Sequence, residues 1–109
     1  MPHKRLDPDT LDAVADRFKV LAEPARLAIL NALRGQRVMS VTALIDETGL
    51  NQANLSKHLQ LLYTHGFVER TRDKSWVYYS LADESVFALC DIMCGQLKRH
   101  VAVRRIAAR

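Results

Sequence analysis

The chain has 109 residues, a formal net charge of +4 and a hydrophobic fraction of 49%. This length predicts a single domain over 1–109, and the lack of an apolar run long enough to cross a bilayer argues against a membrane protein. The N-terminus has no apolar signal core and two cysteines are too few for a disulfide framework, so we expect a cytoplasmic protein with reduced thiols.

Glycines divide the first two thirds of the chain into short helices. Gly35, Gly49 and Gly66 each follow a stretch of helical periodicity, at the position where a left-handed residue ends a helix. The spacing of apolar residues predicts a first helix over 9–21. Pro24 suits the first turn of a second helix, which continues to Gly35 and is apolar enough to be the buried one.

Two closely spaced helices follow and are separated by the tight turn Gly49–Asn51. Ser40 is the expected N-cap of the first, and Asn51 is the expected N-cap of the second, which continues to Gly66. The helical repeat places three leucines of the second helix on one inward face: Leu55, Leu59 and Leu62. This pattern is typical of a helix-turn-helix.

The opposite face of the helix over 51–66 is polar and contains no acidic residue. Asparagine and glutamine can pair with adenine edges, lysine can reach guanine or phosphate, and serine can donate to phosphate. A solvated surface helix would ordinarily include glutamate or aspartate, so we predict that this face enters the major groove of DNA. The predicted contacts are Gln52, Asn54, Ser56, Lys57 and Gln60.

His58 lies at the edge of the inward face. We interpret it as a histidine that is hydrogen-bonded to backbone or phosphate rather than as a metal ligand.

After Gly66 the period of the sequence changes from helical to alternating. VERTR and WVYYSL each alternate at period 2 and are separated by Asp73–Ser75, which predicts a two-stranded hairpin. Arg72 and Lys74 make its tip basic, so the tip can lie along the minor groove or the backbone of DNA. We interpret its aromatic residues as strand packing rather than base stacking: Trp76, Tyr78 and Tyr79.

Asp83 is the expected cap of a last helix that runs from about Glu84 into a basic tail. Cys90 and Cys94 fall on the apolar face of this helix. A disulfide within one helix is disfavoured, because Cβ atoms four residues apart lie about 5–6 Å from each other and a disulfide requires about 3.5–4.5 Å.

Three interpretations of the cysteine pair stay open. The thiols can be small apolar residues in a packed interface. They can bind a soft metal or a metalloid such as arsenite, and a second copy of the helix would offer more thiolates. They can also be oxidised or persulfidated.

Three segments together resemble the ArsR/SmtB family of winged-helix transcriptional repressors: LAEPARLAILNAL (Leu21–Leu33), the run Leu50–Leu81 with LSKHLQLLYTHGFV at its centre, and the closing helix. The resemblance implies a mainly α winged helix-turn-helix with about five helices and a two-stranded wing. It implies a homodimer through the first and last helices that binds a two-fold symmetric operator until an inducer releases it. By position, the family's groove residues are Gln52, Asn54, Ser56 and Lys57, and its wing contacts are Arg72 and Lys74.

The sequence departs from the family's common metal sites. The stretch RVMSVTAL has no cysteine pair, ADESVFAL has no histidine, and His100 has no matching partner. Family members that sense sulfane sulfur have one cysteine on the second helix, where this chain has none. The inducer is therefore not defined by resemblance.

Two alternatives to the inducible repressor follow from the sequence. One is a winged helix that binds a protein partner through its last helix, and the other is a repressor whose cysteines only pack. An enzyme is not expected, because the chain has no glycine-rich phosphate loop and no nucleophile elbow, and its histidines are scattered.

Overall fold

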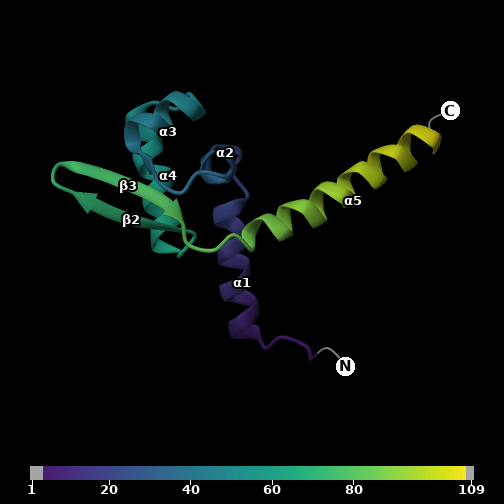
Figure 1. Ribbon diagram of the computed structural model, residues 1–109. Helices are drawn as coiled ribbons and strands as arrows, with labels where there is room; N and C mark the ends of the chain where they lie inside the picture. Colours follow the sequence, from purple (N-terminus) through teal and green to yellow (C-terminus); the bar gives the residue numbers. More distant parts are fainter. Residues whose placement is uncertain (1–3, 108–109) are drawn as a thin grey trace.

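The structure is a computed structural model that describes residues 4–107, with side chains up to residue 102. Within this range the chain forms five helices and three strands (Figure 1). In chain order these are α1 (Pro8–Leu21), α2 (Pro24–Leu33), β1 (Met39–Ser40), α3 (Val41–Thr48), α4 (Gln52–Thr64), β2 (Val68–Asp73), β3 (Trp76–Leu81) and α5 (Val86–Ala107).

The helices begin at the predicted caps. The hydroxyl of Ser40 accepts from the backbone N–H of Ala43 at 3.1 Å, and the side chain of Asn51 accepts from that of Asn54 at 2.9 Å. Gly49 ends α3 with a φ of 73°, a left-handed conformation that glycine adopts without steric cost. The predicted boundaries of α3 and α4 are therefore confirmed.

Two aspartates accept backbone hydrogen bonds near the starts of the outer helices, and Asp7 is the N-cap of α1. Asp7 accepts from the backbone N–H of Thr10 at 2.8 Å at the start of α1, and Asp83 accepts from that of Ser85 at 2.9 Å before α5. These hydrogen bonds lower the pKa of each carboxyl group, because the ionised form is the better acceptor. The predicted cap of the last helix thus binds a residue that precedes it, because α5 begins at Val86 rather than Glu84.

The wing is part of a three-stranded antiparallel sheet with the order β1-β3-β2, rather than the predicted two-stranded hairpin. The short strand β1 pairs Met39 with Tyr79. In the hairpin, Asp73 belongs to β2 and pairs with Trp76, so that only two residues form the turn.

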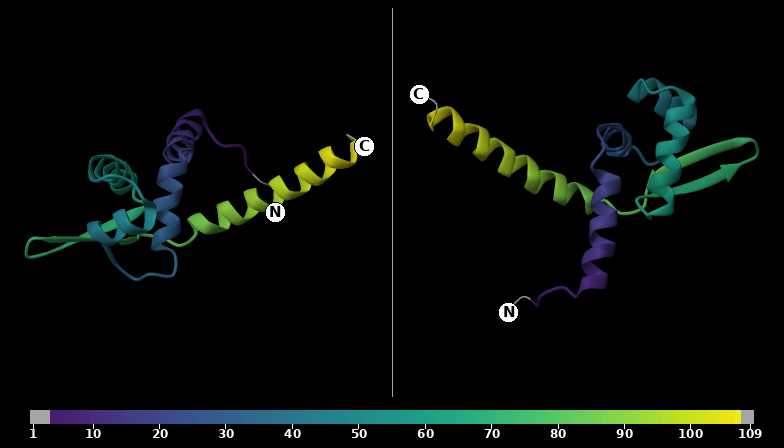
Figure 2. Two further views of the ribbon diagram at one scale, coloured as in Figure 1. Left: turned by 90° about the horizontal axis from the view of Figure 1, so that it is seen from above. Right: turned by 180° about the vertical axis from the view of Figure 1, so that it is seen from behind.

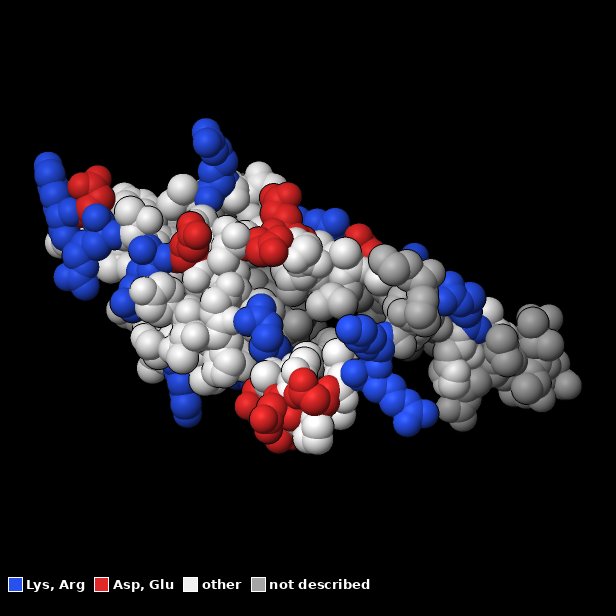
Figure 3. Space-filling model, turned by 90° about the horizontal axis from the view of Figure 1, so that it is seen from below, with Lys and Arg blue, Asp and Glu red and all other residues white. Residues whose placement is uncertain are grey.

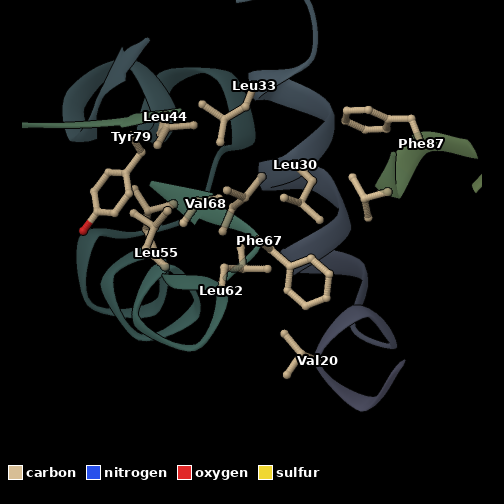
Figure 4. Packing of buried hydrophobic residues seen from close by; sticks show 13 residues of the cluster. Val20, Leu30, Leu33, Leu44, Leu55, Leu62, Phe67, Val68, Tyr79 and Phe87 are labelled. Carbon is tan, nitrogen blue, oxygen red and sulfur yellow. The ribbon is translucent and has the colours of Figure 1, made fainter. Parts of the chain in front are cut away.

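A single hydrophobic core joins α2, α3, α4 and the base of the wing (Figure 4). The three leucines of α4 that were predicted to face inward are all buried. The fully buried side chains, with less than 2% exposure, are Ile29, Leu30, Leu33, Leu44, Leu55, Leu59 and Leu62. The prediction that the second helix is central is confirmed.

The two outer helices are mostly uncovered. Of α1 only Val20 is buried, whereas Leu11 and Phe18 are each 51% exposed. The apolar side of α1 is therefore largely uncovered within one chain. Helix α5 buries Val86 and Phe87 and then projects away from the rest of the molecule (Figures 1 and 2).

No helix within residues 4–107 combines the length and the hydropathy that a bilayer-spanning segment requires.

Two adjacent leucines of α4 should differ strongly in how much their truncation to alanine destabilises the fold. Leu62 has 0% exposure and Leu61 has 37%. Leu62→Ala should lower the free energy of unfolding by about 2–5 kcal/mol, because it leaves a cavity in a close-packed core. Leu61→Ala is the matched control and should cost less than about 1 kcal/mol. Urea unfolding measures both, and equal midpoint shifts would contradict this packing.

Candidate nucleic-acid interface

Helix α4 presents its polar side to solvent because its leucines are anchored in the core. The turn before it is stabilised by Thr48, whose hydroxyl donates to the carbonyl of Leu44 at 2.6 Å and accepts from the N–H of Leu50 at 3.3 Å. Five side chains of α4 that the sequence predicted to meet DNA are all exposed: Gln52, Asn54, Ser56, Lys57 and Gln60. The structure therefore places Ser56, Lys57 and Gln60 on the accessible side of α4, with Gln52 and Asn54 exposed in its first turn.

This face combines hydrogen-bonding side chains with positive potential. Helix α4 contains no acidic residue, and its N-terminal turn carries the positive end of the helix dipole. Gln60 donates to the hydroxyl of Thr64 at 3.2 Å. The amide and ammonium groups of the first two turns are the kinds of group that bind base edges and phosphates.

The register of the wing separates its charges onto two faces. Residues paired across an antiparallel sheet share a face. Arg70 and Arg72 pair with Tyr79 and Val77, so they lie on the face that carries the buried Tyr79. The guanidinium of Arg70 lies 4.2 Å from the ring centre of Tyr63, a residue of α4.

The acidic residues of the wing take the other face. Glu69 pairs with Ser80 and Asp73 pairs with Trp76, so neither carboxylate shares a face with the arginines. Lys74 stands at the tip with a φ of 58°. Figure 3 shows basic side chains gathered at the left end of the molecule, where the wing extends. Because Arg70 contacts Tyr63 of α4, the arginine face of the wing lies on the same side of the sheet as α4.

The aromatic residues of the wing differ in burial. Tyr79 is buried and Tyr78 is half-buried, which confirms that they pack within the fold. Trp76 is 54% exposed at the tip, on the face of Asp73, so the prediction that it packs in the sheet is wrong. Its strand position was predicted, but the core does not extend that far along the hairpin.

His58 is half-buried and its partner is a side chain. A guanidinium nitrogen of Arg26 lies 3.1 Å from Nδ1 of His58. Because guanidinium only donates, Nδ1 is the acceptor and Nε2 carries the ring proton. The partner of Nδ1 is an arginine that the sequence did not single out, rather than a backbone group.

Arg26 also binds the end of α1. It donates to the carbonyl of Val20 and, at 3.4 Å, to that of Lys19. One side chain at the start of α2 therefore connects the C-terminus of α1 to the predicted recognition helix. The sequence did not predict this role of Arg26, because it depends on the end of α1, the start of α2 and the middle of α4 lying close together.

The cysteines lie on the uncovered part of α5. Cys90 is half-buried and Cys94 is exposed, and both are free thiols. Their apolar neighbours Met93 and Leu97 are 62% and 60% exposed. Among the residues described, no three histidine, cysteine, aspartate or glutamate side chains cluster as a metal site. The end of the basic tail, residues 103–109, lies outside the described side chains.

The arrangement is that of a winged helix-turn-helix, a DNA-binding domain, and comparisons with known proteins agree. A family model described as a helix-turn-helix domain matches residues 21–71. The transcriptional regulator NmtR of Mycobacterium tuberculosis is 36% identical over 90 residues, which cover 83% of this chain and 74% of that protein. The biofilm growth-associated repressor of Xylella fastidiosa is 34% identical over 91 residues, with 79% and 78% covered.

A solved structure shows the same fold. The homodimeric winged helix-turn-helix DNA-binding domain Mb0332 of Mycobacterium bovis, a possible ArsR-family regulator, has a TM-score of 0.72 and 34% identity, over 91% of this chain and 95% of that one. The chain belongs to the ArsR/SmtB family of winged helix-turn-helix transcriptional regulators, as its sequence predicted. It is a family of regulators and not of enzymes.

The contacts of Arg26 predict that it stabilises the fold more than an exposed arginine does. Arg26→Met removes the donor from two carbonyls and from His58, and should lower the free energy of unfolding by about 1–3 kcal/mol. Arg34→Met is the control, because Arg34 forms an exposed ion pair with Asp91 at 3.8 Å, which is worth about 0–1 kcal/mol. Arg34 also lies 4.5 Å from the ring centre of Phe87, and methionine can keep a contact with that ring. Equal urea midpoints for the two variants would contradict the role of Arg26.

Proposed function

We propose that this protein is a homodimeric repressor that inserts α4 into the major groove of its operator and lays the wing along the adjacent backbone or minor groove. The observation that carries the proposal is the outer face of α4, which is exposed, polar and free of carboxylates. A basic wing face on the same side of the sheet supports it. The whole of residues 1–109 then serves as one DNA-binding domain.

The contacts divide by chemistry. Gln52 and Asn54, in the first turn of α4, read base edges, since recognition helices enter the groove with their N-terminal residues foremost. Ser56, Lys57 and Gln60 contact phosphates or base edges next to them. Arg72 and Lys74 contact the backbone from the wing.

Lys57 provides a quantitative test with DNA from the protein's own promoter region. Lys57→Ala should weaken binding by roughly tenfold to a hundredfold near 0.1 M salt. It should also lower the slope of log affinity against log salt by about 1.8, or about 0.9 for each of two phosphates in a dimer complex. Lys19→Ala removes the same charge from α1 and should change neither quantity. A gel-shift or fluorescence titration in which the two variants behave alike would contradict the placement of α4.

The uncovered sides of α1 and α5 support a dimer interface. Both helices carry large apolar side chains that this chain leaves exposed: Leu11, Phe18, Leu89, Ile92, Met93 and Leu97. Large apolar patches on small soluble proteins mark interaction sites. The similar domain from Mycobacterium bovis is homodimeric. We therefore assign α1 and α5 to the seam between two copies.

A charge on α5 tests the dimer. Leu97→Glu places a carboxylate in the apolar face and should convert a dimer of twice 12.4 kDa into a monomer at micromolar concentration. Ala102→Glu adds the same charge at an exposed position about 140° around the helix from Leu97 and should leave the dimer intact. Light scattering coupled to gel filtration gives the masses, and an unchanged dimer in Leu97→Glu would move the interface elsewhere.

The inducer is proposed to act on Cys90 and Cys94. A dimer through α5 brings together two thiols from each chain beside the seam, and soft metals, metalloids and oxidants or polysulfides all react with thiolates. Chemistry at the seam then changes the spacing of the two α4 helices. The alternative is that the thiols only pack, for which the half-burial of Cys90 gives some support.

The cysteines are tested on the protein–DNA complex. Arsenite, a soft divalent metal, peroxide and polysulfide are added separately to the reduced complex, and release of DNA is measured. At least one agent should release the wild type and leave the Cys90→Ser/Cys94→Ser double variant bound. If every agent acts equally on both proteins, the cysteines are packing residues.

A further inference from the structure

Arg70 of the wing stacks on a tyrosine of the proposed recognition helix. Its guanidinium lies 4.2 Å from the ring centre of Tyr63, and both side chains are exposed. The two residues belong to β2 and α4, which contact each other (Figure 1). The proposed dimer seam uses α1 and α5, so a second copy of the chain leaves this pair accessible.

The stacked pair lies beside the proposed DNA contacts. Tyr63 follows Ser56 by seven residues, which is close to two helical turns and places the two within about 20° of each other around the helix axis. Arg70 shares its face of the wing with Arg72, because one residue of the same strand separates them. The pair thus occupies the corner between the outer side of α4 and the basic face of the wing.

The positive charge of Arg70 is available to a ligand. Among the side chains described, through residue 102, no carboxylate lies within ion-pair distance of Arg70. The two carboxylates of its strand, Glu69 and Asp73, lie on the other face of the wing. Stacking covers the flat side of a guanidinium and leaves the N–H donors at its edge accessible. An arginine held in this way offers two parallel donors to a phosphate and loses little side-chain entropy on binding.

The course of the DNA backbone supplies that phosphate. When α4 occupies the major groove and the wing reaches the adjacent minor groove, the sugar–phosphate backbone that separates the grooves passes between them. We propose that Arg70 binds a phosphate of this backbone segment and that Tyr63 is a positioning residue that holds the guanidinium in place. Each half of a dimer complex then gains one phosphate contact between those of α4 and those of the wing tip. This inference rests on the proposed function.

Two substitutions separate the charge of Arg70 from its shape. Duplex DNA from the protein's own promoter region is titrated with the reduced full-length protein at several salt concentrations. Arg70→Gln should weaken binding by roughly tenfold to a hundredfold near 0.1 M salt and lower the slope of log affinity against log salt by about 1.8, or about 0.9 for each of two phosphates. Arg70→Lys keeps the charge but loses the planar fork, so it should weaken binding about threefold to tenfold at an unchanged slope.

Substitutions of Tyr63 test the positioning role. Tyr63→Leu removes the ring and keeps the charge of Arg70, so affinity should fall about threefold to tenfold with the slope unchanged. Tyr63→Phe keeps the ring and should bind as the wild type does. In the Arg70→Gln background Tyr63→Leu should cost nothing more, because no guanidinium is left to position. Lys19→Gln, on α1, is the charge control and should change neither affinity nor slope.

The results that would overturn the proposal differ from those that would overturn the proposed function. If Arg70→Gln weakens binding without lowering the slope, the stack only ties the wing to α4 and Arg70 meets no phosphate. Wild-type binding by Arg70→Gln also removes its role, and if Lys57→Ala still lowers the slope, the placement of α4 stands. Wild-type binding by both variants overturns the two proposals together. Urea unfolding shows whether each variant folds. If Arg70→Gln does not, wild-type affinity in both Arg70→Lys and Tyr63→Leu contradicts the proposal.

Discussion

The packing of one side of α4 against α2 is the constraint on which the rest of this structure depends. Leu55, Leu59 and Leu62 have at most 1% exposure and meet Ile29, Leu30 and Leu33 in one core. Because the leucines fix the rotation of the helix about its axis, the polar residues on its other side are exposed to solvent. The exposure of the proposed DNA-binding face is thus a consequence of the hydrophobic core.

Local signals accounted for most of the fold and of the candidate site. Caps such as Ser40 and Asn51, a left-handed glycine and helical periodicity act within a few residues, so α3, α4 and the exposed residues of α4 were predictable. Contacts between distant segments were not predictable, because periodicity does not encode which segments meet. Examples are the pairing of Met39 with Tyr79, the contact of Arg26 with His58 and the exposure of Trp76.

Two arginines hold α4 from outside the core and both involve α1. Arg26 connects His58, in the middle of α4, to the carbonyls at the end of α1. Arg17, on α1 itself, donates to the carbonyl of His65 at the other end of α4. Helix α1 also belongs to the proposed dimer seam. A change at the seam therefore has a direct physical route to the proposed recognition helix.

The central claim is that α4 and the basic face of the wing meet DNA while α1 and α5 do not. Backbone amide NMR shifts, followed as duplex from the protein's own promoter region is added to the reduced protein, test it most directly. The account predicts that the largest changes fall on residues 52–60 and 70–74. Changes concentrated on residues 8–21 and 86–102, with α4 and the wing unaffected, would contradict it.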